Sequence, residues 1–306
     1  MSWAQLPSGR LPSGPAAAAL VALVAAAMAA YCRAGRAKAR TRRPQASVDA
    51  DGRPDPVLPK RTPLSEEDER KLRVCERHIE VHKRRTLILL GDSMTELCWD
   101  DGWVAKLASA LRRRVDVLNY ACSGYNTRWA LAALHKMAAN DALPKPVDGA
   151  IVWYGGADSA LPEGASGSLS IPVQQYREQL TRIVQFAQRH MGARHVLVVA
   201  PAPIDEVRMT DRKDAHTRVY ATAAGEVAKD LGVPFVNMWR AMHDDATRNH
   251  GGHFGRYLSD GMHLNSNGND LVFETMGNAI MKEWGWTFAT LKPDLPNNGE
   301  LAGIAF

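Results

Sequence analysis

Short apolar segments alternate with segments of helical pattern from residue 85 onward, and this alternation constrains the fold more than any other feature of the sequence. Between the apolar runs, hydrophobic residues recur at helical spacing; the runs themselves are Thr86–Gly91, Val115–Tyr120, Ala150–Tyr154, His195–Ala200 and Pro234–Asn237. Runs that are apolar throughout are typical of strands buried on both faces, and strands separated by helices form parallel sheets. The sequence therefore predicts an α/β fold in which helices cover both faces of a parallel sheet.

Polar residues follow the first of these runs, at the end of the sheet where ligands bind in such folds. The run ends in GDSMTE, in which Ser93 lies on a tight turn between a strand and a helix. A serine on such a turn exposes its hydroxyl and keeps its backbone N–H free to donate, which suits a nucleophile. Alternatively, Asp92 and Ser93 only cap the helix, a common role for these residue types.

Two later segments carry residues that would complement a serine nucleophile. Gly124 follows the second run, where a glycine either lets its N–H approach a bound oxygen or merely forms a turn. Asp260 and His263 are three residues apart on a predicted bend, so the carboxylate could orient the imidazole toward a serine. This spacing alone is common in surface loops, but its place just before the last helix of a chain with GDS on its first strand favours a triad.

The three segments GDSMTE, NYACSGYNTRWA and SDGMHLNSNGNDLVF together resemble the GDSL/SGNH serine hydrolase family, and in particular its isoamyl acetate-hydrolysing esterase branch. The resemblance covers about residues 85–285. It implies a three-layer α/β/α fold with a five-stranded, flavodoxin-like parallel sheet. It also implies that Ser93 is the nucleophile, His263 the base and Asp260 the orienting carboxylate, and that the N–H groups of Ser93 and Gly124 stabilise the oxyanion.

One block departs from the pattern of the family. Where the family has Gly-x-Asn-Asp, with the asparagine as a third oxyanion donor, this chain reads GGADS, and Ala157 occupies the position of the asparagine. A shift of one residue would instead place Asp158 there, and an ionised carboxylate would repel an oxyanion. The sequence thus favours a slow or specialised hydrolase, and the alternative is a non-catalytic or weakly active ligand-binding or scaffold protein on the same fold.

The resemblance predicts a carboxylic ester hydrolase that acts on small, acetate-type esters through a Ser-His-Asp triad and an acyl-enzyme. We expect the substrate to be contacted by residues beside the motifs, namely Asp92, Asn126, Trp129 and Asp158. Trp99, Trp129 and Trp153 could line an acyl pocket, although core packing explains a tryptophan equally well.

The sequence predicts no cofactor and no metal. It contains neither the glycine-rich phosphate loop GxxxxGK[ST] nor GxGxxG after a strand, so no nucleotide or dinucleotide is expected. The pairs His78/His82 and His250/His253 have spacings that a metal could use, but no cysteine or carboxylate pattern completes either pair.

The basic charge of the chain resides in its N-terminal segment. Residues 1–48 hold seven of the 38 Lys and Arg residues and none of the 33 acids, which leaves a formal charge of −2 on the rest. A nearly neutral folded part argues against a nucleic-acid-binding domain.

The sequence divides into four parts. Residues 1–48 are an Ala/Arg-rich segment, residues 49–63 a linker, residues 64–290 the catalytic domain and residues 291–306 a C-terminal tail. The uncharged run 15–32 fits a weak membrane anchor with the domain on the cytoplasmic side, an organellar transit peptide or, third, a secretory signal.

Overall fold

The computed structural model describes residues 64–302, so the predicted N-terminal segment 1–48 and linker 49–63 lie outside the described residues. At its centre is a parallel sheet of five strands in the order β2-β1-β3-β4-β5. The strands are β1 (Arg85–Gly91), β2 (Val115–Asn119), β3 (Gly149–Trp153), β4 (His195–Val199) and β5 (Phe235–Val236). Each lies within one or two residues of a run predicted from the sequence.

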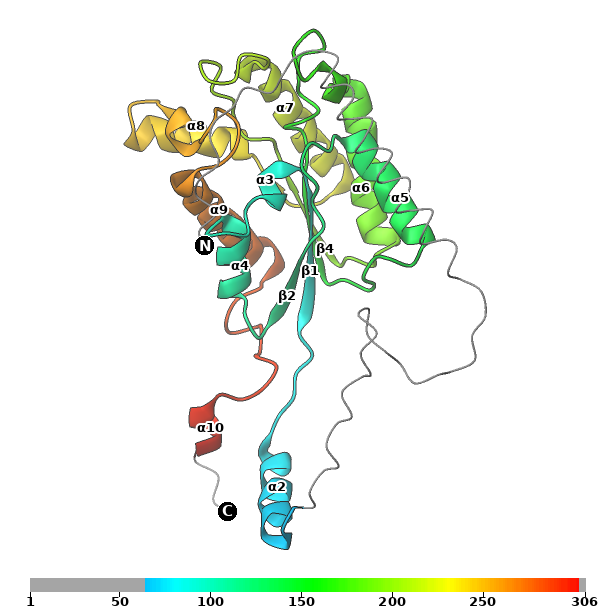
Figure 1. Ribbon diagram of the computed structural model, residues 1–306, viewed down its shortest axis with the longest axis vertical. Helices are drawn as coiled ribbons and strands as arrows, with labels where there is room; N and C mark the ends of the chain where they lie inside the picture. The colour runs from blue at the N-terminus through cyan, green and yellow to red at the C-terminus, as the bar shows by residue number, and fades with distance from the viewer. Residues whose placement is uncertain (1–63, 303–306) are drawn as a thin grey trace, which may run out of the picture. The chain divides into compact units, whose positions relative to one another are not determined.

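Helices cover both faces of this sheet (Figure 1). On one face lie α5 (Thr127–Ala139), α6 (Val173–Arg189) and α7 (Asp214–Leu231); on the other lie α4 (Trp103–Ala110), α8 (Met238–Asn249) and α9 (Ser266–Trp284). This is the three-layer α/β/α fold that the resemblance implied, and the prediction is confirmed.

The central strand β1 contributes to both hydrophobic cores. Ile88 and Leu90 pack with side chains of α5, α6 and α7, whereas Leu87 and Leu89 pack with side chains of α4, α8 and α9. Successive side chains of a strand point to opposite faces, so a strand covered on both sides is apolar at every position. This is why the first run could be recognised as a buried strand.

Several shorter elements complete the described chain. They are α2 (Glu66–His78), α3 (Ser93–Glu96), η1 (Gly167–Leu169), η2 (Phe254–Tyr257) and α10 (Asn298–Ala302). In the predicted tail, Leu291 is buried and Asp294 pairs with Arg84 and Arg113. Within residues 64–302, no helix is both long and apolar enough to cross a bilayer.

The strand order brings three predicted motif segments together. Gly91, at the end of β1, pairs with Trp153 at the end of β3, and its carbonyl accepts a hydrogen bond from Cys122 N–H, just beyond β2. The chain segments that follow β1, β2 and β3 therefore start side by side at the carboxyl edge of the sheet.

Candidate active site

Ser93, His263 and Asp260 form a continuous chain of hydrogen-bonded side chains. The His263 Nε2 atom lies 2.8 Å from Ser93 Oγ, and its Nδ1 atom lies 2.6 Å from Asp260 Oδ2. Ser93 is the first residue of α3, the short helix that follows β1, and only 6% of its surface is exposed. Asp92 caps this helix by accepting a hydrogen bond from Met94 N–H. Two residues 170 positions apart thus meet, and the arrangement can transfer a proton from a serine to an imidazole.

The Asp260 carboxylate is held by its own loop. Its Oδ1 atom accepts hydrogen bonds from Met262 N–H at 2.9 Å and from His263 N–H at 2.8 Å. Partial burial alone would raise the pKa of Asp260, but the hydrogen bonds from His263 and Met262 outweigh it and lower the pKa to about 2. Asp260 is therefore a carboxylate at neutral pH and presents a full negative charge to the Nδ1 side of the ring.

The N–H groups of Ser93 and Gly124 are free to bind a ligand, since neither donates to another protein group within residues 64–302. Gly124 has φ of +76°, a left-handed conformation that favours glycine, and a Cβ atom added there would meet nothing within 4 Å. The neighbouring Ser123 N–H donates to the Glu96 carboxylate at 2.5 Å, which fixes this turn to α3. A glycine N–H on a fixed turn beside open space can receive a developing negative charge.

The segment that follows β3 carries Ala157 at the position where the family pattern has an oxyanion-binding asparagine. Ala157 is 2% exposed, and its N–H donates to the Asp92 carboxyl group. The next residue, Asp158, accepts hydrogen bonds from the N–H and hydroxyl of Thr127 on α5, at 3.0 and 2.5 Å. Its carboxyl group thus contacts a helix N-terminus, and Ala157 carries no side-chain donor.

Burial changes the acidity of these two carboxyl groups. Burial is the largest influence on both and raises the pKa of Asp92 to about 6 and the pKa of Asp158 to about 7. Hydrogen bonds from Met94 and Ala157 to Asp92, and from Thr127 to Asp158, act in the opposite direction without cancelling this effect.

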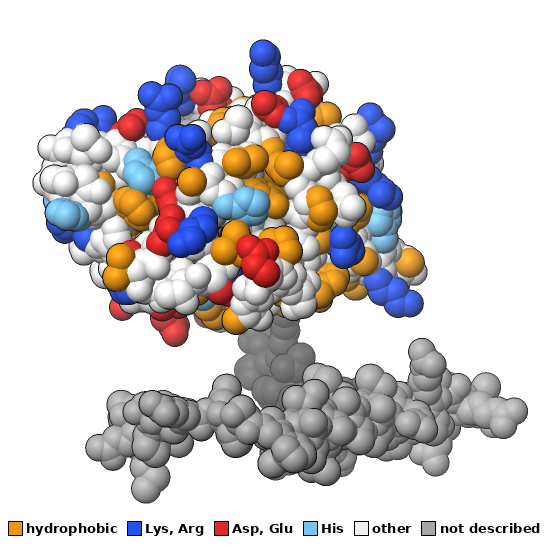
Figure 2. Space-filling view, turned by 90° about the horizontal axis from the view of Figure 1, so that it is seen from above, with side chains coloured by type: hydrophobic (Ala, Val, Ile, Leu, Met, Phe, Trp, Pro, Cys, Tyr) orange, Lys and Arg blue, Asp and Glu red, His pale blue; other side chains and the backbone are white. Residues whose placement is uncertain are grey.

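The four predicted substrate-contacting residues fall into two groups. Asp92, Asn126 and Asp158 are at most 2% exposed and bond to the protein, so their burial favours a role in shaping the loops over direct contact with a substrate. Trp129 is 42% exposed and makes an edge-to-face contact with Tyr125, with ring centroids 6.4 Å apart. Figure 2 shows this end of the molecule, where hydrophobic side chains gather near the middle of the face.

The other two tryptophans considered for an acyl pocket also differ from each other. Trp153 is buried in the core beside Trp103, so it does not line a pocket at the surface. Trp99 is 46% exposed and follows α3 closely in the chain.

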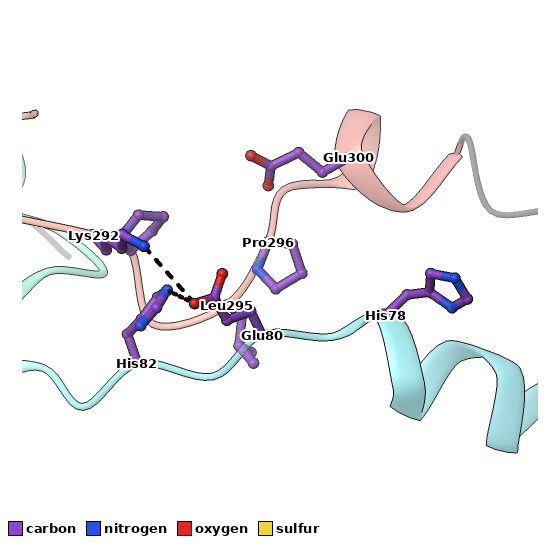
Figure 3. Close-up of a pocket in the computed structure, with 8 residues that line it drawn as sticks. His78, Glu80, His82, Lys292, Leu295, Pro296 and Glu300 are labelled. Carbon is purple, nitrogen blue, oxygen red and sulfur yellow. Dashed lines mark ion pairs between the residues drawn. The ribbon is translucent and has the colours of Figure 1, made fainter.

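A cavity of about 410 Å³ lies away from the triad (Figure 3). His78, Glu80, His82 and Lys292 are among its lining residues, and Glu80 pairs with both His82 and Lys292. His82 precedes β1, so this cavity lies on the amino-terminal side of the sheet, opposite Ser93. In the part of the chain that the structure describes, no group of three His, Cys, Asp or Glu residues is arranged to hold a metal.

Two arginines beside the site were not predicted from the sequence. Arg212 is 4% exposed and donates to the Gly156 carbonyl oxygen at 2.8 Å, and Arg208 bonds to the loop that carries Asp260. Both lie in the segment after β4. The charged segment that follows β4, a strand ending at the expected site, was the available signal for these arginines. Their hydrogen-bond partners are distant in the sequence, so the contacts could not be predicted from it.

Comparison with known proteins gives the family. The model of the GDSL-like Lipase/Acylhydrolase family matches residues 89–271, which include the segments with Ser93, Gly124, Asp260 and His263. The chain belongs to this family. The resemblance inferred from the sequence is confirmed.

Individual relatives of this GDSL-type chain are carboxylic ester hydrolases by name. It is 32% identical over 229 residues to a GDSL esterase/lipase of Arabidopsis thaliana. The aligned region covers 70% of this chain and 92% of that protein. It is also 32% identical over 210 residues to the human isoamyl acetate-hydrolyzing esterase 1 homolog, covering 64% of this chain and 82% of that one.

Solved structures share the fold of this GDSL-type chain. A lipase/acylhydrolase from Enterococcus faecalis superposes with a TM-score of 0.52 at 22% identity, covering 68% of this chain and 98% of that one. The acetylxylan esterase Axe2 from Geobacillus stearothermophilus gives a TM-score of 0.53 at 16% identity, covering 67% of this chain and 97% of that one. At these identities the likeness concerns the fold alone.

Proposed function

We propose that this GDSL-type chain is a serine esterase that hydrolyses small carboxylic esters of the acetate type. The observation that carries the proposal is the unbroken hydrogen-bonded chain from Asp260 through His263 to Ser93. The names of the relatives, which include isoamyl acetate-hydrolyzing esterase homologs, support the class of substrate.

The proposed reaction passes through an acyl-enzyme. His263 Nε2 takes the proton of Ser93 while Oγ attacks the ester carbonyl carbon, and the N–H groups of Ser93 and Gly124 bind the resulting oxyanion. The protonated imidazole, stabilised by Asp260, gives its proton to the departing alcohol, which leaves acetylated Ser93. A water molecule then loses a proton to His263 and attacks the acyl carbon, which releases the acid and regenerates the serine.

Ala157 sets the expected rate of this reaction. Removing one oxyanion donor from an enzyme of this type costs about 10²–10³ in turnover. Two backbone donors and the triad remain, so we propose a slow or specialised esterase. The second candidate function is a non-catalytic ligand-binding or scaffold protein, which the missing amide favours.

The remaining residues have supporting roles in the proposal. Trp129, exposed beside Tyr125, is the predicted substrate contact best placed to bind an apolar group. In this proposal residues 64–290 form the catalytic domain, and residues 15–32 serve as a membrane anchor, as part of an organellar transit peptide or, third, as a secretory signal.

Labelling with a fluorophosphonate probe tests the proposal, since the probe reacts with activated serines. We expect one labelled site in the wild type, none in Ser93→Ala and full labelling in Ser123→Ala, which removes an exposed serine beside the site. A small acetate ester should compete with the probe. Labelling that persists in Ser93→Ala would remove Ser93 from the mechanism, and a wild type that is neither labelled nor active would favour the binding protein.

A further inference from the structure

Asp260 and His263 lie in an irregular segment, residues 258–265, between η2 and α9. A base that must meet a serine within hydrogen-bond distance needs a support that holds its loop in place, because an error of about 1 Å can cost 10²-fold in rate. Hydrogen bonds within the loop hold Asp260 to His263, but they do not tie the loop to the sheet.

The side chain of Arg208, in the segment after β4, makes such a tie. Its Nη1 atom donates to the carbonyl oxygens of Leu258 at 2.9 Å and Ser259 at 3.0 Å, and its Nη2 atom donates to the Gly255 carbonyl oxygen. Its Nε atom donates to Asp205 Oδ2 at 2.8 Å, which orients the guanidinium group from its own segment. One planar group thus bonds three backbone carbonyls that immediately precede the Asp260 turn.

The backbones of the two segments also approach each other closely. Asp205 N–H donates to the Gly261 carbonyl oxygen at 2.8 Å. A Cβ atom at Gly261, where φ is +100°, would lie 2.9 Å from the Asp205 carbonyl oxygen, and a Cβ at Gly255 would lie 2.7 Å from Asp205 Oδ2. Both positions therefore need glycine for the loop to seat against Asp205 and Arg208.

We propose that Arg208 is a positioning residue for the esterase reaction, which acts by docking the Asp260–His263 loop onto the segment after β4. This inference rests on the proposed function, because it assigns Arg208 to the alignment of His263 with Ser93. Arginine suits the task because its rigid fork presents several donors in one plane, whereas a lysine ammonium is a single compact charge.

The test compares Arg208→Lys and Arg208→Gln with the same changes at Arg113. Arg113 is a matched control, since its side chain is 40% exposed against 38% for Arg208. It likewise bonds a carboxylate, Asp294, and two backbone carbonyls, those of Leu295 and Pro296. Arg113 lies between α4 and β2, at the amino-terminal end of the strands, whereas Ser93 lies at their carboxyl end.

Two measurements are made on each full-length variant. The first is kcat and KM on a short-chain acetate ester, and the second is hydrogen–deuterium exchange of the peptide that spans residues 255–265. We expect the Arg208 variants to lose roughly tenfold to hundredfold in kcat with KM within about twofold of the wild type. We also expect faster exchange in that peptide, while the Arg113 variants change neither quantity there.

Defined outcomes overturn the inference. Arg208 variants with wild-type kcat and wild-type exchange in residues 255–265 would show that the loop does not depend on Arg208. Equal losses of kcat in the Arg208 and Arg113 variants would show a general loss of structure. If Arg208→Gln does not fold, Arg208→Lys, which retains a cation for Asp205, and Gly255→Ala, which crowds the same ion pair, carry the test.

Failure of the proposed function would look different. In that case the wild type is neither labelled by the fluorophosphonate probe nor active, and the exchange measurement alone decides whether Arg208 docks the loop.

Discussion

At the residue scale, the smallest decisive feature is the methyl side chain of Ala157. It stands where the pattern of the family has an asparagine amide, and its own N–H is engaged by Asp92. In the proposed reaction the oxyanion is therefore bound by the N–H groups of Ser93 and Gly124, without a side-chain donor at position 157. A substitution at position 157 therefore tests the two proposed functions, a weakened esterase and a binding protein, against each other.

Restoring the amide should raise turnover. We expect Ala157→Asn to increase kcat by about tenfold or more on a short-chain ester with little change in KM, because the new donor acts on the transition state. Ala157→Leu adds a side chain with the same branching and number of heavy atoms as asparagine but without a donor, and it is the control. Steady-state kinetics of the three proteins checks this, and an equal effect of both changes would mean that volume, not hydrogen bonding, matters at this position.

The second prediction at this scale concerns Asp260, whose pKa is lowered to about 2. Asp260→Asn removes the negative charge that orients and stabilises the imidazolium, and it should reduce kcat by about 10³-fold or more, as in the serine protease triad. Asp116→Asn, at an exposed carboxylate paired with Arg84, should leave kcat unchanged. Near-normal turnover of Asp260→Asn would show that another group orients His263.

At the scale of elements, asparagine and aspartate residues begin the helices that follow β1, β2 and β5. Asp92 caps α3, Asn126 caps α5 and Asn237 caps α8, each accepting a hydrogen bond from a backbone N–H two or three residues later. These caps end each strand sharply and start the next helix at the edge of the sheet. The motif residues are held by the same turns.

Asn126 should be the most important of these caps. Its side chain is fully buried, accepts from Trp129 N–H at 3.0 Å and donates to the Leu169 carbonyl oxygen at 3.0 Å. Asn126→Ala should lower the free energy of unfolding by about 2–3 kcal/mol, because it removes a cap and leaves the partly buried Leu169 carbonyl without its donor. Urea unfolding measures this; Asn237→Ala, which removes a cap alone, should cost about 1 kcal/mol. Equal losses would contradict the second bond.

At the scale of the whole molecule, two carboxyl groups lie inside the protein near one another. Asp92 and Asp158 are both buried. Burial is the main cause that raises the pKa of Tyr154 and lowers the pKa of Arg212, and the negative charge of each carboxylate acts to raise both of these pKa values. Burial favours the neutral form of a carboxyl group. The stability of the molecule should therefore depend on pH through these groups.

The sign of this dependence follows from the pKa of Asp158, which burial raises to about 7 in the folded protein from an ordinary value of 3.8. Between these values the folded state binds the proton more tightly than the unfolded state, so the stabilisation is present below about pH 4 and is lost as pH rises through about 7. From pH 5 to pH 8, the free energy of unfolding of Asp158→Asn should accordingly fall less, or rise more, than that of the wild type.

Urea unfolding at both pH values measures this difference, with Asp116→Asn as the control at an exposed position. The same pH dependence in the wild type and Asp158→Asn would show that Asp158 titrates alike in both states.

Sequence patterns were sufficient for features that depend on neighbours in the chain. The strands were recognisable because a buried parallel strand is apolar at every position, and the turns at Ser93 and Asp260 because their residues carry local motifs. The polar-rich α8 was missed, since only Met238, Met242 and Ala246 mark its buried face. The charged residues 65–85 have the composition of one surface helix, but α2 ends at His78, and residues 79–84 lead into β1 instead.

Only the tertiary structure decided how these parts meet. The order β2-β1-β3-β4-β5 and the distance of 2.8 Å between His263 and Ser93 depend on packing between segments far apart in the chain. So do the burial of Asp158 against α5 and the docking of Arg208 on the carbonyls of residues 255–259. Local sequence determines which side chains are available at each strand end, whereas partners and burial arise when the layers close around the sheet.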